Sequence, residues 1–113
     1  MKYIVAVIQS HKLEDVRHVL SGLGVDGLTV VDVRRYGSHE EHTEVYRADH
    51  QVGYLPRTKI EFAVADEHVQ SVAGAIRDAA VTGEVGDGRI YILELAHTVQ
   101  IKSGKVDAAV TAL

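Results

Sequence analysis

Residues 2–8 read KYIVAVI, an almost unbroken run of β-branched and other apolar residues. A strand with one face in water alternates apolar and polar residues, so an unbroken run indicates a strand that is covered on both faces. Residues 59–64, KIEFAV, alternate instead, with Ile60, Phe62 and Val64 on one face. Together the two stretches predict a sheet that carries a core on one face and needs a cover for the other.

The remaining elements follow from helical spacing and from helix start and stop signals. Ser10 and Asp66 can each cap a helix, and Gly24 and Gly83 offer the matching stops. The predicted order is strand 2–8, helix 10–24, strand 28–36, strand 59–64, helix 66–83 and strand 89–95.

This order indicates an α+β fold, a ferredoxin-like βαββαβ sandwich formed by a single domain over residues 1–113. Both helices of such a sandwich cover the same sheet face. The opposite face is bare, although the strands carry apolar residues on it. Another copy of the chain, in a closed symmetric oligomer, is the simplest cover.

Composition excludes several classes of function. The chain has 113 residues, 46% of them hydrophobic, and a net charge of -4, which disfavours direct nucleic-acid binding. It has no cysteine, so disulfides, thiolate catalysis and zinc-thiolate sites are excluded. No stretch approaches the roughly 20 apolar residues of a membrane span, and the N-terminus lacks a signal-peptide pattern. We therefore expect a cytoplasmic protein without membrane insertion.

Residues 37–54, GSHEEHTEVYRADHQVGY, form a polar stretch without helical or strand periodicity. A loop of this length in a small domain is typically functional. Its histidines, with neighbouring carboxylates, suit zinc, copper or nickel. A metal site on His39, His42 and His50 is therefore one hypothesis, and a solvated loop that faces a partner is the other.

Residues 82–89, TGEVGDGR, place three glycines and Arg89 between the second helix and the last strand. Backbone N–H groups exposed in such a turn can form an anion-binding concavity, and Arg89 can add a charge-assisted contact to a phosphate. The alternative is an ordinary glycine turn with a solvated Arg89.

The residues do not indicate an enzyme. Ser10 with His11, and Ser38 with His39, are neighbours in sequence, which does not give the geometry of a catalytic triad. A small ferredoxin-like enzyme would need a convergent acid-base pair, for which Glu44 and Glu61 are the available carboxylates.

Three motifs carry a resemblance to a known family, namely residues 42–47 (HTEVYR), residues 54–61 (YLPRTKIE) and residues 82–89. They resemble the PII (GlnB/GlnK-like) nitrogen-regulatory signal-transduction proteins, and the similarity spans the whole chain, including Gly27–Val30 and Lys102–Gly104. The resemblance implies a trimer with an ATP, ADP or AMP site in each cleft between subunits. Residues 37–54 would be the T-loop that docks on a partner, such as a membrane transporter or a metabolic enzyme.

The resemblance also implies roles for individual residues. Tyr46 and Arg47 would dock on the partner, Arg47 for instance in the pore of an ammonium channel. His39 and Arg57 would lie where relatives bind 2-oxoglutarate with Mg²⁺. The implied nucleotide-binding residues are Thr29, Gly37, Ser38, Glu61, Ala63, Gly86, Asp87, Gly88, Arg89, Gln100 and Lys102, the last two in a C-terminal segment over residues 97–113.

The chain departs from the family pattern at several of these positions. Ser38 and His39 stand where relatives have arginine and glutamine, so we expect altered 2-oxoglutarate sensing. Gln100 replaces a basic residue, which favours ADP or AMP over ATP. Arg35 replaces a glycine beside the cleft, and we expect it to crowd that cleft.

The sequence thus predicts a non-enzymatic PII-like regulator that requires no cofactor. One alternative is a carbon-linked or bicarbonate-linked regulator that has lost 2-oxoglutarate sensing, and another is the metal-binding trimer.

Overall fold

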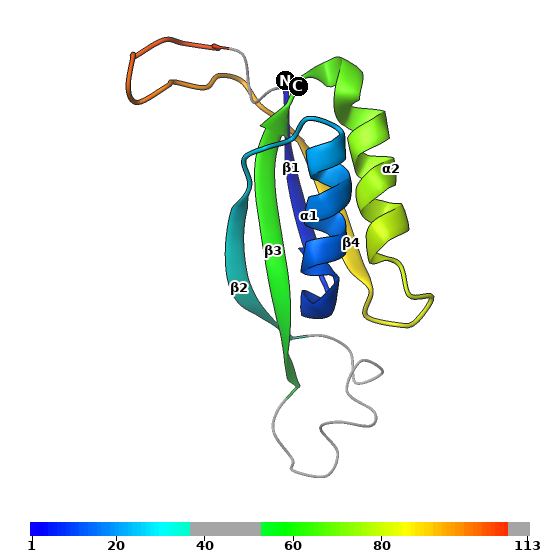
Figure 1. Cartoon of the computed structure of the whole chain (residues 1–113). Coiled ribbons are helices and arrows are strands. Elements are labelled where there is room, and N and C mark those ends of the chain that lie inside the picture. The colour runs from blue at the N-terminus through cyan, green and yellow to red at the C-terminus, as the bar shows by residue number, and fades with distance from the viewer. Residues whose placement is uncertain (37–52, 109–113) are drawn as a thin grey trace.

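The computed structural model describes residues 1–36 and 53–108 (Figure 1). Their strands form a 4-stranded sheet in the order β2-β3-β1-β4, and every neighbouring pair is antiparallel. The strands are β1 (Lys2–Ile8), β2 (Thr29–Tyr36), β3 (Tyr54–Val64) and β4 (Gly88–Glu94). The helices are α1 (Leu13–Gly22) and α2 (Val69–Ala80), each preceded by a short 3-10 turn, Ser10–Lys12 and Asp66–His68.

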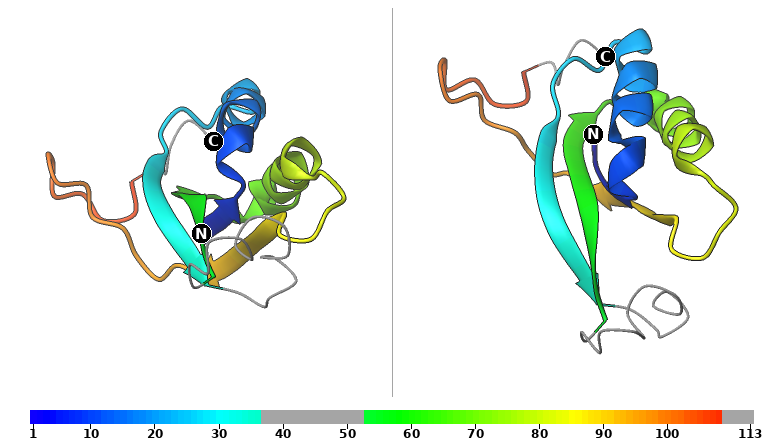
Figure 2. Two further views of the ribbon diagram at one scale, coloured as in Figure 1. Left: turned by 90° about the horizontal axis from the view of Figure 1, so that it is seen from below. Right: turned by 60° about the horizontal axis from the view of Figure 1, so that its bottom comes forward.

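Both helices pack on one face of the sheet and leave the other face open (Figures 1 and 2). The core between the helices and the sheet is made of aliphatic side chains and a single aromatic ring, Phe62. Ile4, Ala6 and Ile8 of β1 are almost completely buried in it. The predicted α+β, ferredoxin-like βαββαβ arrangement is therefore confirmed.

The stop predicted for the first helix is confirmed at Gly24, which has a φ of 92°. The N–H of Gly24 donates to the carbonyl of Ser21, and the N–H of Val25 donates to the carbonyl of Leu20 at 2.9 Å. Such a left-handed residue satisfies carbonyls that the helix end would leave unpaired, and glycine adopts it without steric cost.

The predicted helix caps are wrong at both N-termini. Neither helix start has a capping side chain. The hydroxyl of Ser10 instead accepts a hydrogen bond from the buried Thr58 at 2.9 Å, and Asp66 pairs with Lys2 of β1 at 3.3 Å. Tertiary neighbours attract these side chains, which local capping rules do not consider.

Two predicted boundaries also need correction. β3 begins at Tyr54 rather than Lys59, because its first residues pair with the last residues of β2, up to Tyr36. Tyr54 therefore belongs to the strand and not to the long loop. The second helix ends at Ala80, since Val81 is already extended. Gly83, with a φ of 87°, therefore lies in the following turn rather than at the helix stop.

The open sheet face carries alternate residues of every strand, as the register shows. Tyr3, Val5 and Val7 of β1 lie on it, and so do Tyr91 and Leu93 of β4, which are 48% and 47% exposed. Burial and the nearby Glu61 carboxylate raise the pKa of Tyr3 above its ordinary value. Large apolar side chains thus remain in contact with solvent in the single chain.

Residues 97–107 form a segment that we call the C-terminal hairpin, which projects away from the sheet on the side that the helices leave open (Figure 2). A bridge between Val99 and Val106 joins its two arms. At its base His97 Nδ1 lies 2.9 Å from Asp107 Oδ2, and the other Asp107 oxygen accepts the N–H of Thr98. These contacts, the His97 pair first, lower the pKa of Asp107.

The hairpin has little contact with its own chain. Ile101, near its tip, is 100% exposed. No helix in residues 1–36 and 53–108 has the length and apolarity to cross a bilayer.

Gly88 is the tightest position of the fold and provides a test of it. A Cβ atom there would lie 1.9 Å from the carbonyl oxygen of Val7, and its φ of 110° disfavours any other residue. We expect Gly88→Ala to lower the free energy of unfolding by about 2–4 kcal/mol, measured by urea denaturation.

The matched control is Gly74→Ala in α2, where nothing lies within 4 Å of the added Cβ. Alanine is the better helix former by about 1 kcal/mol, so this variant should be at least as stable as the parent. Equal stability of the two variants would contradict the steric argument.

Candidate functional site

The turn between α2 and β4 is organised by the side chain of Asp87. One carboxylate oxygen accepts the N–H groups of Thr82 and Gly83, at 2.8 and 2.9 Å. The other accepts the hydroxyl of Thr82 and, at 3.3 Å, the side-chain amide of Gln9. Asp87 therefore holds the turn in shape, and its carboxylate is occupied within the chain.

The pKa of Asp87 reflects these contacts. Partial burial by itself would raise the pKa, but the hydrogen bonds from Thr82, Gly83 and Gln9 together hold it below its ordinary value. The carboxylate is thus ionised at neutral pH, which makes it a stronger acceptor for the turn.

The backbone of the turn is suited to an anion. Gly86 and Gly88 have φ values of 92° and 110°, and the N–H of Glu84 donates to the hydroxyl of Thr82. Among the described residues, the N–H groups of Val85 and Gly86 have no hydrogen-bond acceptor. Unpaired N–H groups in a turn of alternating handedness form the kind of concavity that binds phosphate.

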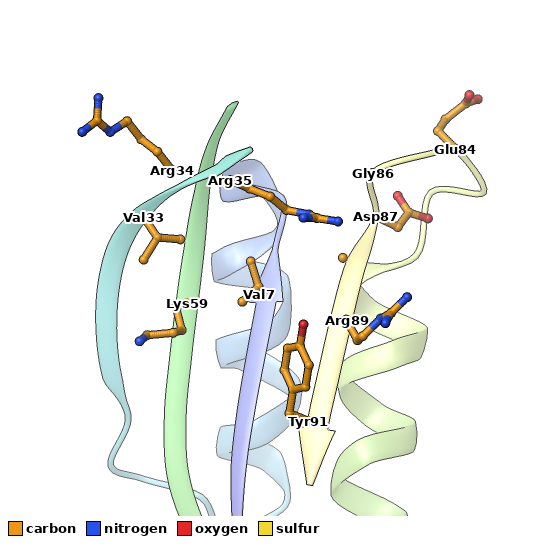
Figure 3. A pocket seen from close by; sticks show the side chains of 11 residues that line it. Val7, Val33, Arg34, Arg35, Lys59, Glu84, Gly86, Asp87, Arg89 and Tyr91 are labelled. Atoms are coloured by element: carbon orange, nitrogen blue, oxygen red, sulfur yellow. The ribbon is translucent and has the colours of Figure 1, made fainter. Parts of the chain in front are cut away.

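A cavity of about 570 Å³ lies between this turn and the open sheet face (Figure 3). Its floor is formed by Val7, Val33 and Tyr91. Cationic and acidic side chains surround the floor, with Lys59 and Arg89 among the cations. The residues that line it are Val7, Val33, Arg34, Arg35, Lys59, Glu84, Gly86, Asp87, Gly88, Arg89 and Tyr91.

Arg57 connects the turn to the start of β3. Its guanidinium donates to the carbonyl of Pro56 at 2.8 Å and to the carbonyl of Gly86 at 3.4 Å. The Nε atom is buried and has no partner among the described residues. Arg57, which the sequence analysis associated with an effector, thus lies against the turn at residues 82–89, which we call the phosphate turn after its predicted role, and donates a hydrogen bond to it.

The predicted nucleotide-binding residues that the structure describes lie at two ends of the chain. The residues predicted to contact phosphate, Gly86–Arg89, line the cavity at one end of the sheet. Thr29 and Glu61, which face each other across β2 and β3, lie toward the other end, as does Ala63. Gln100 and Lys102 are carried by the C-terminal hairpin, far from the turn (Figure 1).

Several predicted residues lie outside the described part of the chain. They are Gly37, Ser38, His39, His42, Tyr46, Arg47 and His50. Within residues 1–36 and 53–108, no group of three or more histidine and acidic side chains could hold a metal ion. The metal hypothesis on His39, His42 and His50 therefore stays a prediction.

The two ends of the long segment meet at an aromatic pair. Tyr36 and Tyr54 are register partners at the ends of β2 and β3, with ring centroids 5.3 Å apart. The Arg34 guanidinium lies 5.6 Å from the centre of the Tyr54 ring. This end of the sheet is also the end at which the phosphate turn lies (Figure 1).

Sequence reasoning missed Gln9, Val7, Lys59 and Tyr91 as parts of the site. The alternation of side chains along a strand places Val7, Lys59 and Tyr91 on the cavity face of the sheet. This placement can be predicted only once the register of β1, β3 and β4 is known. Gln9 approaches Asp87 from 78 positions away in the chain, a contact that no local pattern signals.

The fold and this cavity define an α+β sandwich protein with a glycine-rich turn and a cavity beside an open sheet face. The family model "Nitrogen regulatory protein P-II" matches residues 1–105 of the chain. The chain therefore belongs to the P-II family of nitrogen regulatory proteins, and the predicted resemblance is confirmed.

Similar proteins agree with this assignment. The chain is 42% identical to the nitrogen regulatory protein GlnK of Escherichia coli K12 over 110 residues, which cover 96% of this chain and 98% of that protein. It is 43% identical to the nitrogen regulatory protein P-II of Rhizobium etli over 109 residues, with 96% and 97% covered. The crystal structure of Arabidopsis thaliana PII bound to citrate has the same fold, with a TM-score of 0.78 at 24% identity over 99% of this chain and 90% of that one.

Asp87→Asn tests the role of the carboxylate in the turn. An amide can accept hydrogen bonds through one oxygen only, so we expect the free energy of unfolding at pH 7 to fall by about 1 kcal/mol. Amide hydrogen exchange of Thr82 and Gly83 should become faster.

The difference between parent and variant should depend on pH. Because the pKa of Asp87 is lowered in the folded state, its contribution is complete above the ordinary pKa of about 4 and is lost as the pH falls through the folded value. Urea denaturation at pH 7 and pH 3 measures this, and a difference that is the same at both pH values would contradict the assignment.

Proposed function

We propose that this protein is a trimeric, non-enzymatic signalling protein of the cytoplasm that binds ATP, ADP or AMP between subunits. The nucleotide state biases the long segment, residues 37–53, toward or away from a protein partner. A membrane transporter or an enzyme of nitrogen or carbon metabolism is the kind of partner that this arrangement suits.

The observation that carries the proposal is the division of the predicted nucleotide residues into two groups at opposite ends of one chain. Gly86–Arg89 lie beside the cavity, whereas Gln100 and Lys102 lie on a hairpin that projects from the far end (Figure 1). One nucleotide cannot touch both groups of the same chain. A neighbouring subunit, whose hairpin reaches this cavity, brings the two groups together.

The open sheet face supports the same arrangement. Val5, Val7, Tyr91 and Leu93 form an apolar surface on it, and soluble monomers rarely expose such a surface. The two groups of site residues lie on different surfaces of the chain, so a contact that joins them is heterologous. Heterologous contacts between identical subunits form a ring when the rotation closes. A trimer is the ring that the family resemblance implies.

Each end of the nucleotide meets suitable chemistry. The phosphates meet the free N–H groups of the turn and the charge of Arg89, with Lys102 of a neighbouring hairpin as a further cation. Thr29 and Glu61 of the neighbouring subunit, which lie toward the same end of that subunit as its hairpin, supply hydroxyl and carboxylate groups for the nucleoside end. The apolar floor of Val7 and Tyr91 supports a bound ring or ribose.

The placement of Arg57 favours a second candidate, a regulator linked to carbon status through bicarbonate rather than 2-oxoglutarate. Its guanidinium already donates to two carbonyl oxygens, so it is less available to a dicarboxylate. Ser38 and His39 also differ from the family pattern at the effector position.

Isothermal titration of ATP, ADP and AMP into the purified oligomer tests the proposal. We expect micromolar binding of at least ADP, at one nucleotide per subunit. Adding Mg²⁺ with 2-oxoglutarate or with bicarbonate separates the two candidates, because only the true effector should tighten nucleotide binding. Absence of heat with every nucleotide would overturn the nucleotide proposal.

A complementation experiment tests whether each site is shared by two subunits. We expect Arg89→Gln and Lys102→Gln each to weaken ADP binding about tenfold or more, the effect of losing a charge-assisted hydrogen bond. In trimers that mix the two variants, some clefts combine an intact turn from one chain with an intact hairpin from another. Those clefts should bind ADP as the parent does.

If each site belonged to one chain, every chain of the mixed trimer would carry a defect. Mixing would then restore no tight binding, and the shared-site proposal would fail. Trimers reassembled from a single variant serve as the control.

A further inference from the structure

The cavity beside the phosphate turn is bordered on the β2 side by Arg35. Figure 3 shows the Arg35 side chain extending from β2 across β1, with its guanidinium toward Gly86 and Asp87. Arg35 is thus a cation that comes from one edge of the sheet and reaches toward a turn at the other edge.

The strand geometry explains this direction. Arg35 and Val33 are two residues apart on β2 and share a face, and Val33 forms part of the cavity floor. Arg34 lies between them in sequence and belongs to the opposite face. Figure 3 shows the Arg34 side chain pointing away from the cavity, and its guanidinium lies near the Tyr54 ring.

The other cations near the cavity are placed differently. Lys59 is 3.8 Å from the carboxylate of Glu61 and points away from the turn. Arg57 donates to backbone carbonyls. Arg89 lies at the outer side of β4 (Figure 3). Arg35 and Arg89 therefore flank the cavity from opposite edges of the sheet.

The distance between those edges determines what can contact both. β2 and β4 are separated by two strands, so their backbones are about 14 Å apart at about 4.8 Å per strand spacing. A single phosphate in the turn at β4 leaves most of that width unfilled. A chain of two or three phosphates extends toward β2, where a guanidinium can contact its oxygens in a bidentate manner.

We infer that Arg35 binds the phosphate chain of the ligand and makes this site select for nucleotides with two or more phosphates over AMP. The inference rests on the proposed nucleotide-binding function and names the residue that sets phosphate-number preference. The sequence analysis expected Arg35 to crowd the cleft, whereas this inference assigns it a favourable contact with the phosphates. The basic charge missing at Gln100 is in this way supplied from β2.

The test compares Arg35→Gln with the parent and with the control Arg17→Gln. Arg17 lies on α1, outside the cavity, where it pairs with Glu14, and both substitutions remove one positive charge from the chain. Isothermal titration with ADP, ATP and AMP should show about tenfold weaker binding of ADP and ATP in Arg35→Gln. AMP binding should change less than about twofold, and Arg17→Gln should bind all three as the parent does.

One further variant and two outcomes make the result decisive. Arg35→Lys keeps the charge without the planar fork and should recover only part of the ADP affinity. If Arg35→Gln is folded, by circular dichroism, and binds ADP as tightly as the parent, the inference is wrong while the nucleotide proposal stands. Equal weakening of AMP and ADP also overturns it, since phosphate selectivity would then have another source.

If the parent binds no nucleotide, the proposed function fails, and the inference is tested by inorganic pyrophosphate and tripolyphosphate alone. Binding of these anions that is weakened about tenfold in Arg35→Gln, but not in Arg17→Gln, supports Arg35 as the phosphate contact. No binding of either anion, or equal binding by all variants, overturns the inference.

Discussion

The rest of the structure depends on the pairing of β1 with β3 and β4 at the same time. This central strand places Ile4, Ala6 and Ile8 in the core under the helices. Its other face supplies Val7 to the floor of the cavity. The close approach of Gly88 to the Val7 carbonyl aligns β4 with β1 and so sets the position of the phosphate turn.

The turn itself is stabilised mainly by groups that the ligand does not need. Asp87 uses its carboxylate on Thr82, Gly83 and Gln9, and this leaves backbone N–H groups of the neighbouring residues free. Preorganised donors of this kind bind an anion without reorganising at the moment of binding. Arg57, near the start of β3, donates to the Gly86 carbonyl in the same turn. This hydrogen bond connects the turn to the strand that follows the long segment.

The open sheet face and the projecting hairpin have a common cause. A βαββαβ chain has two helices for one sheet, so one face has no cover from its own chain. The apolar residues of that face and Ile101 of the hairpin stay exposed in the single chain, and in the proposed trimer a neighbouring copy contacts them. In the proposed trimer, assembly and ligand binding are linked, because the contact that covers the face also brings the hairpin to the cavity.

The sequence by itself determined the order of strands and helices, because unbroken or alternating apolar runs such as those at 2–8 and 59–64 report burial directly. It also located the turn between the second helix and the last strand through its glycines, and the long segment through its lack of periodicity. Only the tertiary structure decided the partners of Ser10 and Asp66, the early start of β3 and the positions of Gln9 and Arg35 around the turn. These features depend on strand register and on contacts between residues far apart in the chain, which the local spacing of residues in the sequence does not reveal.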